Sequence, residues 1–158
     1  MTKHRKKRNS GMTLIEIMVA SVVLLIAVLG TSSIRYHTVL NARKAEAQIS
    51  AARVGSLLCE SWRGFLGNAA YDPVASLNPD VDIVVSVEGP AVGTGYTGLG
   101  SYKVIIDEMN FYSTLSWQDV SAGLRLLNVS VSWDQRGYDT AAFADADKTI
   151  ALSTYASF

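Results

Sequence analysis

The spacing of hydrophobic positions changes along the chain, and each change predicts a different element. Residues 12–30 are almost entirely apolar, and as one helix they would extend about 28 Å, close to the hydrocarbon thickness of a bilayer. From residue 34 to residue 66, apolar positions recur every three or four residues, as in a helix with one buried face. These positions are Leu40, Ala47, Ala51, Val54, Leu58, Trp62 and Phe65. No proline precedes Pro73, so the pattern predicts one helix from about residue 12 to about residue 66.

Beyond residue 66 the period changes from the helical repeat to strand alternation. Glycine and proline mark a loop, and four segments then alternate apolar and polar residues. They are residues 81–89, 101–107, 126–134 and 148–156. In the first of them Val81, Ile83, Val85 and Val87 are expected on one apolar side. An antiparallel sheet with one apolar face needs a cover, which the striped helix can supply. The sequence therefore predicts an α+β fold, a long N-terminal helix packed on a four-stranded antiparallel sheet.

Charge is unevenly distributed, although the formal net charge is zero. Five basic residues lie within the first eight positions, and all fourteen acidic residues lie from Glu16 onward. Basic residues before an apolar span hold the N-terminus in the cytoplasm and send the following chain outward. Without residues 1–11, nine basic residues face fourteen acidic ones. This balance does not favour a nucleic-acid-binding surface, and no nucleic-acid partner is expected.

Glu16 is the anomaly of the apolar segment. A carboxylate costs roughly 2.5–3.5 kcal/mol at the centre of a membrane helix on insertion scales. The simplest explanation is a charge near the helix N-terminus, where the helix dipole favours an anion.

The residues around Glu16 support a more specific interpretation. The stretch SGMTLIEIMVA resembles the N-terminal signal of type IV pilins and of type II secretion pseudopilins, with matches at Gly11, Thr13, Leu14, Ile15 and Glu16. The resemblance implies that a prepilin peptidase cuts after Gly11 and methylates the new N-terminus at Met12. The family usually has Phe where this chain has Met12, and it tolerates Met at that position.

The resemblance also gives Glu16 a role. It implies that the amine of Met12 in one subunit meets the Glu16 carboxylate of a neighbour, which sets the register of assembly and makes burial of both charges tolerable. The implied partners are prepilin peptidase, other pilin or pseudopilin subunits and the inner-membrane assembly platform.

The same resemblance implies a division of the chain into four parts. Residues 1–11 are a cytoplasmic leader that is removed. Residues 12–33 form the membrane-spanning or filament-core half of a pilin-like helix, residues 34–66 its amphipathic half, and residues 67–158 a β-rich head in the periplasm. The implied location is the inner membrane, with one span, and then a pilus or pseudopilus.

The C-terminal segments LRLLNVSVSWDQRG and KTIALSTYAS resemble the closing strands of PilV-like minor pilins. A single cysteine, Cys59, excludes the disulfide-bounded loop of many major pilins. These features favour a minor type IV pilin. The alternatives are a minor pseudopilin of a type II secretion system and a membrane-anchored binding module that forms no filament.

Three patterns suggest other chemistry and are weak. The stretch GTGYTG (residues 93–98) fits a dinucleotide fingerprint, but a strand pattern follows where that motif needs a helix. Asp134, Asp139, Asp145 and Asp147 lack the spacing of an EF-hand. His37 and Cys59 would lie about 33 Å apart on one helix, too far for a catalytic pair. We therefore expect no enzyme activity, no cofactor and no metal site, and a buried structural role for Cys59.

Overall fold

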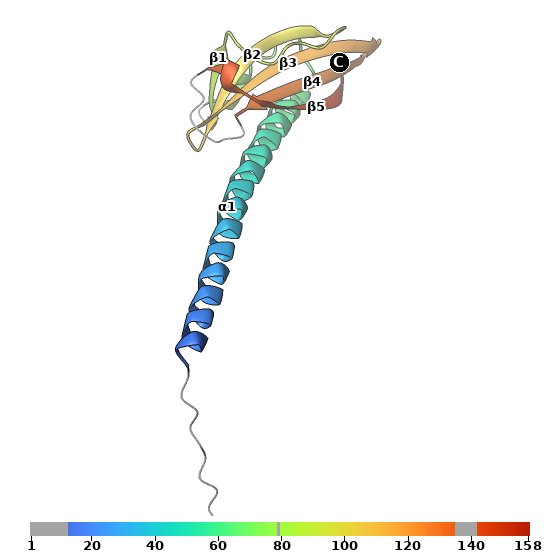
Figure 1. The fold of residues 1–158 in the computed structure, drawn as a ribbon. Coiled ribbons are helices and arrows are strands. Elements are labelled where there is room, and N and C mark those ends of the chain that lie inside the picture. Colours follow the sequence, from blue (N-terminus) through green and yellow to red (C-terminus); the bar gives the residue numbers. More distant parts are fainter. Residues whose placement is uncertain (1–12, 79, 135–141) are drawn as a thin grey trace, which may run out of the picture. The chain divides into compact units, whose positions relative to one another are not determined.

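A computed structural model describes residues 13–78, 80–134 and 142–158 of the chain. Helix α1 runs from Leu14 to Gly64 (Figure 1). By its contacts the chain divides into two units, residues 1–41 and residues 42–158. The division falls inside α1, a few residues before the helix begins to bury one side.

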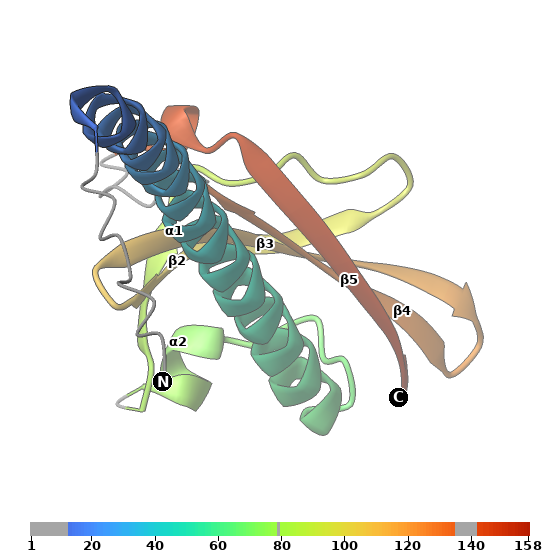
Figure 2. The same cartoon turned by 60° about the horizontal axis from the view of Figure 1, so that its bottom comes forward.

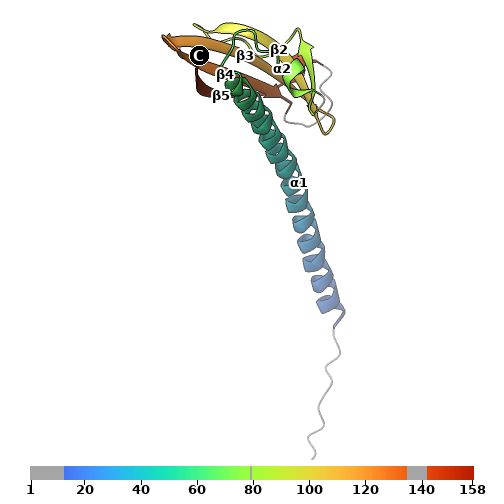
Figure 3. The same ribbon diagram turned by 180° about the vertical axis from the view of Figure 1, so that it is seen from behind.

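The second unit holds the rest of the secondary structure. Its elements are α2 (Pro73–Leu77), β1 (Asp82–Ser86), β2 (Thr97–Ile106), β3 (Met109–Ser121), β4 (Leu124–Trp133), the 3₁₀ helix η1 (Phe143–Asp145) and β5 (Lys148–Ser157). The strands form one antiparallel sheet in the order β1-β2-β3-β4-β5. Helix α2 contacts β1, on the β1–β2 side of the sheet (Figure 3). The predicted α+β class is confirmed.

The predicted number of strands is wrong, because the sheet has five strands and not four. The missed strand is the central one, β3, whose residues Asn110–Ser116 are all buried. Ser113 lies on the apolar side of β3 between Phe111 and Leu115, and its hydroxyl donates to the Tyr102 carbonyl at 3.2 Å. A strand that is buried on both faces does not show clean apolar and polar alternation, so the sequence pattern did not reveal it.

The core lies between the second half of α1 and one face of the sheet (Figure 2). The helix contributes Ala47, Ala51, Val54, Leu58, Cys59 and Trp62, and the sheet contributes residues of all five strands, among them Phe111, Leu115, Leu127, Val129 and Val131. The stripe predicted from Ala47 to Trp62 is therefore confirmed. Phe65 departs from it, since the helix ends at Gly64 and the Phe65 side chain is exposed.

A glycine sets how closely the helix approaches the sheet. A Cβ atom at Gly55 would lie 2.6 Å from Cδ1 of Leu152 on β5 and 3.5 Å from Cγ2 of Val131 on β4. Glycine in a helix interior costs up to about 1 kcal/mol relative to alanine. That cost is explained here by the close approach of β5.

The other face of the sheet carries hydroxyl and amide side chains that bond across strands. Asn128 donates to Ser116 Oγ at 3.3 Å and accepts from Ser153 Oγ at 3.0 Å. The loop between β1 and β2 covers part of this face, because a Cβ at Gly89 would lie 2.5 Å from Thr114 Oγ1. The sheet is thus apolar toward α1 and polar on the opposite face.

Candidate functional site

The N-terminal end of α1 is built by a reciprocal pair of side chains. The backbone N–H and the hydroxyl of Thr13 donate to Oε2 of Glu16, at 2.9 and 3.2 Å. In return, the backbone N–H of Glu16 donates to Oγ1 of Thr13 at 3.3 Å. Thr13 immediately precedes the first helical residue, Leu14, and Glu16 lies in the first turn. This arrangement is a capping box, in which an N-cap threonine and an acidic residue three positions later satisfy each other's backbone groups.

The capping box gives Glu16 a structural role within its own chain. The first backbone N–H groups of a helix have no partner in the helix, and leaving them unpaired in an apolar medium is costly. Glu16 satisfies one of them and places its negative charge at the positive end of the helix dipole. The charge was predicted at this end of the helix, but the cap was not, although the spacing T-x-x-E is sufficient to predict it.

The other two predicted site residues, Gly11 and Met12, lie outside the described residues. The first described residue, Thr13, directly follows Met12 in the sequence. In the chain cut as the resemblance implies, the new amine would therefore be separated from the capping box by a single peptide bond.

The described part of the first unit presents apolar side chains over most of its length. Every residue from Leu14 to Gly30 is exposed, and the most apolar 18-residue window of α1 has a mean hydropathy of 2.5 with none of it buried. In the described part of the chain, α1 is the one helix long and apolar enough to cross a membrane. Its hydroxyl groups bond to its own backbone, since Ser21 donates to the Met18 carbonyl and Thr31 to those of Ala27 and Val28. Such bonds reduce the cost of placing a hydroxyl in an apolar medium.

The C-terminal end of α1 is closed by a Schellman motif. The N–H of Gly67 donates to the Trp62 carbonyl at 3.1 Å, and the N–H of Leu66 donates to the Arg63 carbonyl at 2.9 Å. Leu66 has φ +56° and Gly67 has φ +64°. Glycine normally takes the first of these left-handed positions, so an exposed leucine there is strained.

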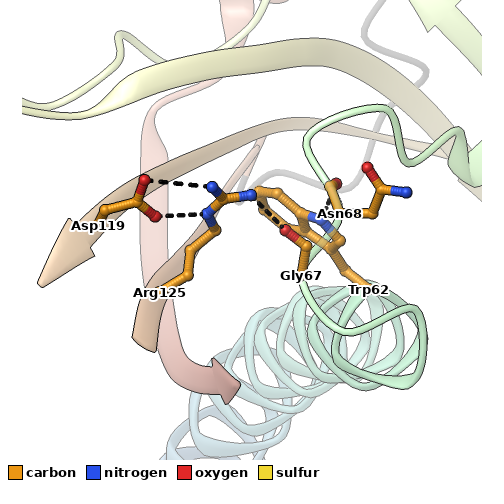
Figure 4. A network of polar contacts seen from close by, with 5 residues as sticks. All are labelled: Trp62, Gly67, Asn68, Asp119 and Arg125. Carbon is orange, nitrogen blue, oxygen red and sulfur yellow. Dashed lines mark hydrogen bonds and ion pairs between the residues drawn. The ribbon is translucent and has the colours of Figure 1, made fainter. Parts of the chain in front are cut away.

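Arg125 on β4 ties the segment after α1 to the sheet (Figure 4). Its Nε and Nη2 donate to the two carboxylate oxygens of Asp119 at 2.7 and 3.2 Å, and its Nη1 donates to the Gly67 carbonyl at 2.8 Å. The guanidinium also lies 3.8 Å from the ring centre of Trp117 and 4.4 Å from that of Phe158. With only 7% of its surface exposed, Arg125 is a buried cation that is neutralised and stacked.

Cys59 faces a groove between α1 and β5. The groove holds about 190 Å³ and is lined by Ser56, Cys59, Glu60, Arg63 and residues 152–154. Burial, with a smaller contribution from Glu60, raises the pKa of the Cys59 thiol from 9.0 to about 11. A thiol that stays protonated at neutral pH is a poor nucleophile. The predicted burial of Cys59 is confirmed.

The other sequence patterns stand as follows. Gly93–Tyr96 lie in the loop after β1, and β2 begins at Thr97, so no helix follows the glycines. Within residues 13–78, 80–134 and 142–158, no three His, Cys, Asp or Glu side chains are placed to hold a metal ion. Asp139 lies outside the described residues.

Comparison with known proteins identifies the N-terminal segment. A family model described as the prokaryotic N-terminal methylation motif matches residues 6–32. The match begins among the basic residues, includes Gly11, Met12 and Glu16, and ends just beyond the apolar stretch. No curated protein and no solved structure matches the chain. The methylation motif, together with the apolar first half of α1, supports a place for this chain in the superfamily of type IV pilins and pseudopilins.

Proposed function

We propose that the chain is a minor type IV pilin. Prepilin peptidase cuts it after Gly11 and methylates Met12, the inner membrane holds it by the first half of α1, and the assembly platform then adds it to a pilus or to the complex that primes one. The observation that carries the proposal is the methylation motif over residues 6–32. The protein acts by assembly and not by catalysis.

In assembly, the Glu16 carboxylate exchanges its hydrogen bonds from Thr13 for a contact with the Met12 amine of an adjacent subunit. In the single chain its carboxylate accepts from Thr13. In the cut chain the amine of Met12 carries a positive charge, and the amine of an adjacent subunit is a stronger partner than a neutral N–H group, because charge-assisted bonds are about twice as strong. Pairing the two charges permits both helix ends to enter an apolar filament core.

The apolar half of α1 makes the largest favourable contribution to the free energy of assembly. Its exposed leucine, isoleucine and valine side chains, from Leu14 to Leu29, have lipid as their neighbours in the membrane and helices of other subunits in a filament. The basic residues before Gly11 favour a cytoplasmic N-terminus and place the head in the periplasm.

The first test is mass spectrometry of the N-terminal peptide, from membranes and from sheared surface filaments. The expected peptide begins at N-methylated Met12 and is present in both fractions. A methylated peptide confined to the cell fraction would instead assign the chain to a type II secretion pseudopilus. A mature protein that retains KHRKKRNSG would identify a membrane-anchored binding module and would contradict the proposal.

Replacing Gly11 by valine tests the cut site. The variant should keep its leader and be missing from the sheared fraction, because the peptidase needs a small residue before the scissile bond. Normal processing of Gly11→Val would place the cut elsewhere.

Two replacements of Glu16 separate its two roles. Glu16→Gln keeps the capping box, which accepts glutamine as well as glutamate, but removes the charge. Glu16→Ala removes both. If the charge sets the register, both variants should be cut normally and both should be depleted from filaments by at least about tenfold, which corresponds to about 1.4 kcal/mol. Retention of Glu16→Gln in filaments would reduce Glu16 to a helix cap.

A further inference from the structure

The sheet of the head has two free edges. Among the described residues, β1 pairs only with β2 and β5 pairs only with β4. A free edge presents unpaired backbone N–H and C=O groups, which folded proteins usually protect with charges, prolines or bulges. From Thr149 to Ser157, β5 has no charged residue and no proline. Over these residues the edge lacks protection by charge or proline, although the Leu152 carbonyl accepts a hydrogen bond from the Cys59 thiol at 3.8 Å.

The edge at β1 carries apolar side chains that the head leaves in solvent. Val85 is 74% exposed and Val87 is completely exposed, although both were predicted on the apolar side with the buried Ile83. The prediction failed because the buried core reaches β1 at Ile83 but does not include Val85, and Val87 lies beyond the end of β1 at Ser86. Acidic residues flank these valines, since Asp82 precedes them and Glu88 follows them.

The edge at β5 has a groove beside it. This is the groove of about 190 Å³ that Cys59 faces, between α1 and residues 152–154. Arg63 lines this groove together with Glu60, beside the middle of β5, and Lys148 at the start of β5 approaches Asp147 at 3.9 Å. A docked strand with an acidic residue at each end would meet an open edge, a groove and two cations, each of which already has one acidic neighbour.

The register of the sheet aligns these features. Four antiparallel pairings separate β1 from β5, so the two strands run in the same direction. Following the pairs across the sheet, Val85 lies in one row with Ile150. Along the strand direction, Asp82 is then offset from this row toward Lys148, and Glu88 is offset from it toward Arg63.

We propose that β1 of one copy of this chain docks as an additional parallel strand on the free edge of β5 of a second copy. Val85 and Val87 then lie at the groove between β5 and α1. Glu88 lies near Arg63, and Asp82 lies near Lys148. The β1 edge carries both signs of charge, because Lys103 pairs with Val84 across β1 and β2 and lines one hollow with Val85, Val87 and Glu88. A contact between two β1 edges is therefore the rival outcome, and a single cysteine at position 87 detects it.

The contact is heterologous, because different surfaces of the two copies meet. Such contacts continue as rings or open arrays and do not stop at dimers. The inference goes beyond the proposed function, since heads held in a membrane could pair in this way whether or not they later enter a filament.

Disulfide trapping in the full chain, in membranes, tests the contact. Val87→Cys and Ser153→Cys, combined in a Cys59→Ser background, place one thiol on each edge. Oxidation with copper phenanthroline and oxygen should give a ladder of dimers, trimers and larger species. The matched control is Val120→Cys with Ser153→Cys, because Val120 is also exposed but lies near the end of β3, away from the proposed contact. The control should give no ladder, and each single cysteine should remain monomeric.

A charge exchange gives a second readout that does not depend on a cysteine pair being perfectly placed. In the double-cysteine chain, Glu88→Arg should lower the ladder yield roughly fivefold, as expected for the loss of about 1 kcal/mol from an exposed ion pair. Adding Arg63→Glu should restore the yield. Unfolding temperatures of the variants within a few degrees of the parent would show that the heads remain folded.

The outcomes are separable. Equal ladders from the Val87 and Val120 pairs, dimers from Val87→Cys alone, or a cross-link to a different protein would each overturn the contact. Methylated Met12 without a ladder would reject the edge contact and leave the proposed function standing. A ladder without methylated Met12 would support the contact and reject the proposed function.

Discussion

The two halves of helix α1 differ in how their apolar side chains are arranged and in how far they are buried. From Leu14 to Gly30 every residue is exposed, and apolar side chains lie on all sides. From Ala47 to Trp62 the apolar residues form one stripe that the sheet covers. The first half is suited to a medium that is apolar on all sides, whereas the second suits a boundary between a protein core and water. One helix thus combines a membrane segment and a core helix, and the pattern of its side chains separates the two.

The largest effect that distinguishes the halves is expected at Trp62. This side chain is fully buried, stacks on Tyr71 with ring centres 6.0 Å apart, and donates from Nε1 to the Asn68 carbonyl at 2.9 Å. Trp62→Ala should lower the free energy of unfolding of the head by about 3–5 kcal/mol, the usual cost of deleting a large buried aromatic side chain. The measurement is thermal unfolding of the full chain in detergent. Val19→Ala, in the exposed half of the same helix, is the control and should leave the head unchanged.

Arg125 tests how firmly the end of the buried half is held. Arg125→Ala should cost about 2–3 kcal/mol, because it removes a buried cation and leaves Asp119 and the Gly67 carbonyl without their donor. Urea unfolding measures the loss. Lys148→Ala is the matched control, since its pair with Asp147 is long and about half exposed and is worth less than about 0.5 kcal/mol. Equal effects would mean that the Arg125 network does not hold the helix end.

Alkaline pH should weaken the buried half through Cys59. The pKa of this thiol is 9.0 when exposed and about 11 in the fold, so the folded head binds the proton more tightly than the unfolded chain. Its contribution is complete below pH 9 and is lost as pH rises through 11. The expected loss is about 2 kcal/mol. Burial also raises the pKa of Tyr71 and of Tyr102, which adds to the loss in the same direction.

The measurement for Cys59 is the free energy of urea unfolding at pH 8 and at pH 11, in the parent and in Cys59→Ala. The variant should be less sensitive to pH because it lacks the thiol. An identical pH dependence in both chains would contradict the assignment.

The smallest effect is expected at Leu66, and it should be stabilising. Leu66 has a left-handed backbone at the end of the helix, which costs a non-glycine residue about 1–2 kcal/mol. Glycine removes that strain but is more flexible when unfolded, so Leu66→Gly should gain about 0.5–1 kcal/mol. A rise in the thermal midpoint of the head checks it, with Phe65→Gly as the control that should give no gain. A lower midpoint for Leu66→Gly would show that the leucine side chain contributes more than its strain costs.

The sequence was most informative where one period dominates. The helical stripe from Ala47 to Trp62 and the alternation of β4 were both predicted, because each element has one face in the core and one face outside it. The central strand β3 was missed because Ser113 lies on its apolar side and satisfies its hydroxyl with a backbone carbonyl. No pattern read along the chain shows which polar groups find partners inside the fold.

In the candidate site, too, contacts between residues that are distant in the sequence were not predicted. Glu16 was placed by its local motif, which depends on neighbours in the sequence. The contact of Arg125 with Gly67 joins residues 58 positions apart, and Val85 is exposed because the buried core reaches β1 only at Ile83. These features follow from the three-dimensional arrangement of distant segments, which local spacing does not encode.

The close approach at Gly55 has a consequence for any attempt to improve this protein by mutation. Alanine would normally raise helix stability at such a position, and the clash with Leu152 could be relieved because its Cδ1 is the free end of a flexible side chain. The neighbouring open space is the groove beside β5, so a relaxed Leu152 would occupy the place proposed for a second copy. Screens for thermal stability alone would favour such a variant while selecting against association. At Gly55, higher stability of the single chain and stronger association between copies are therefore opposing requirements.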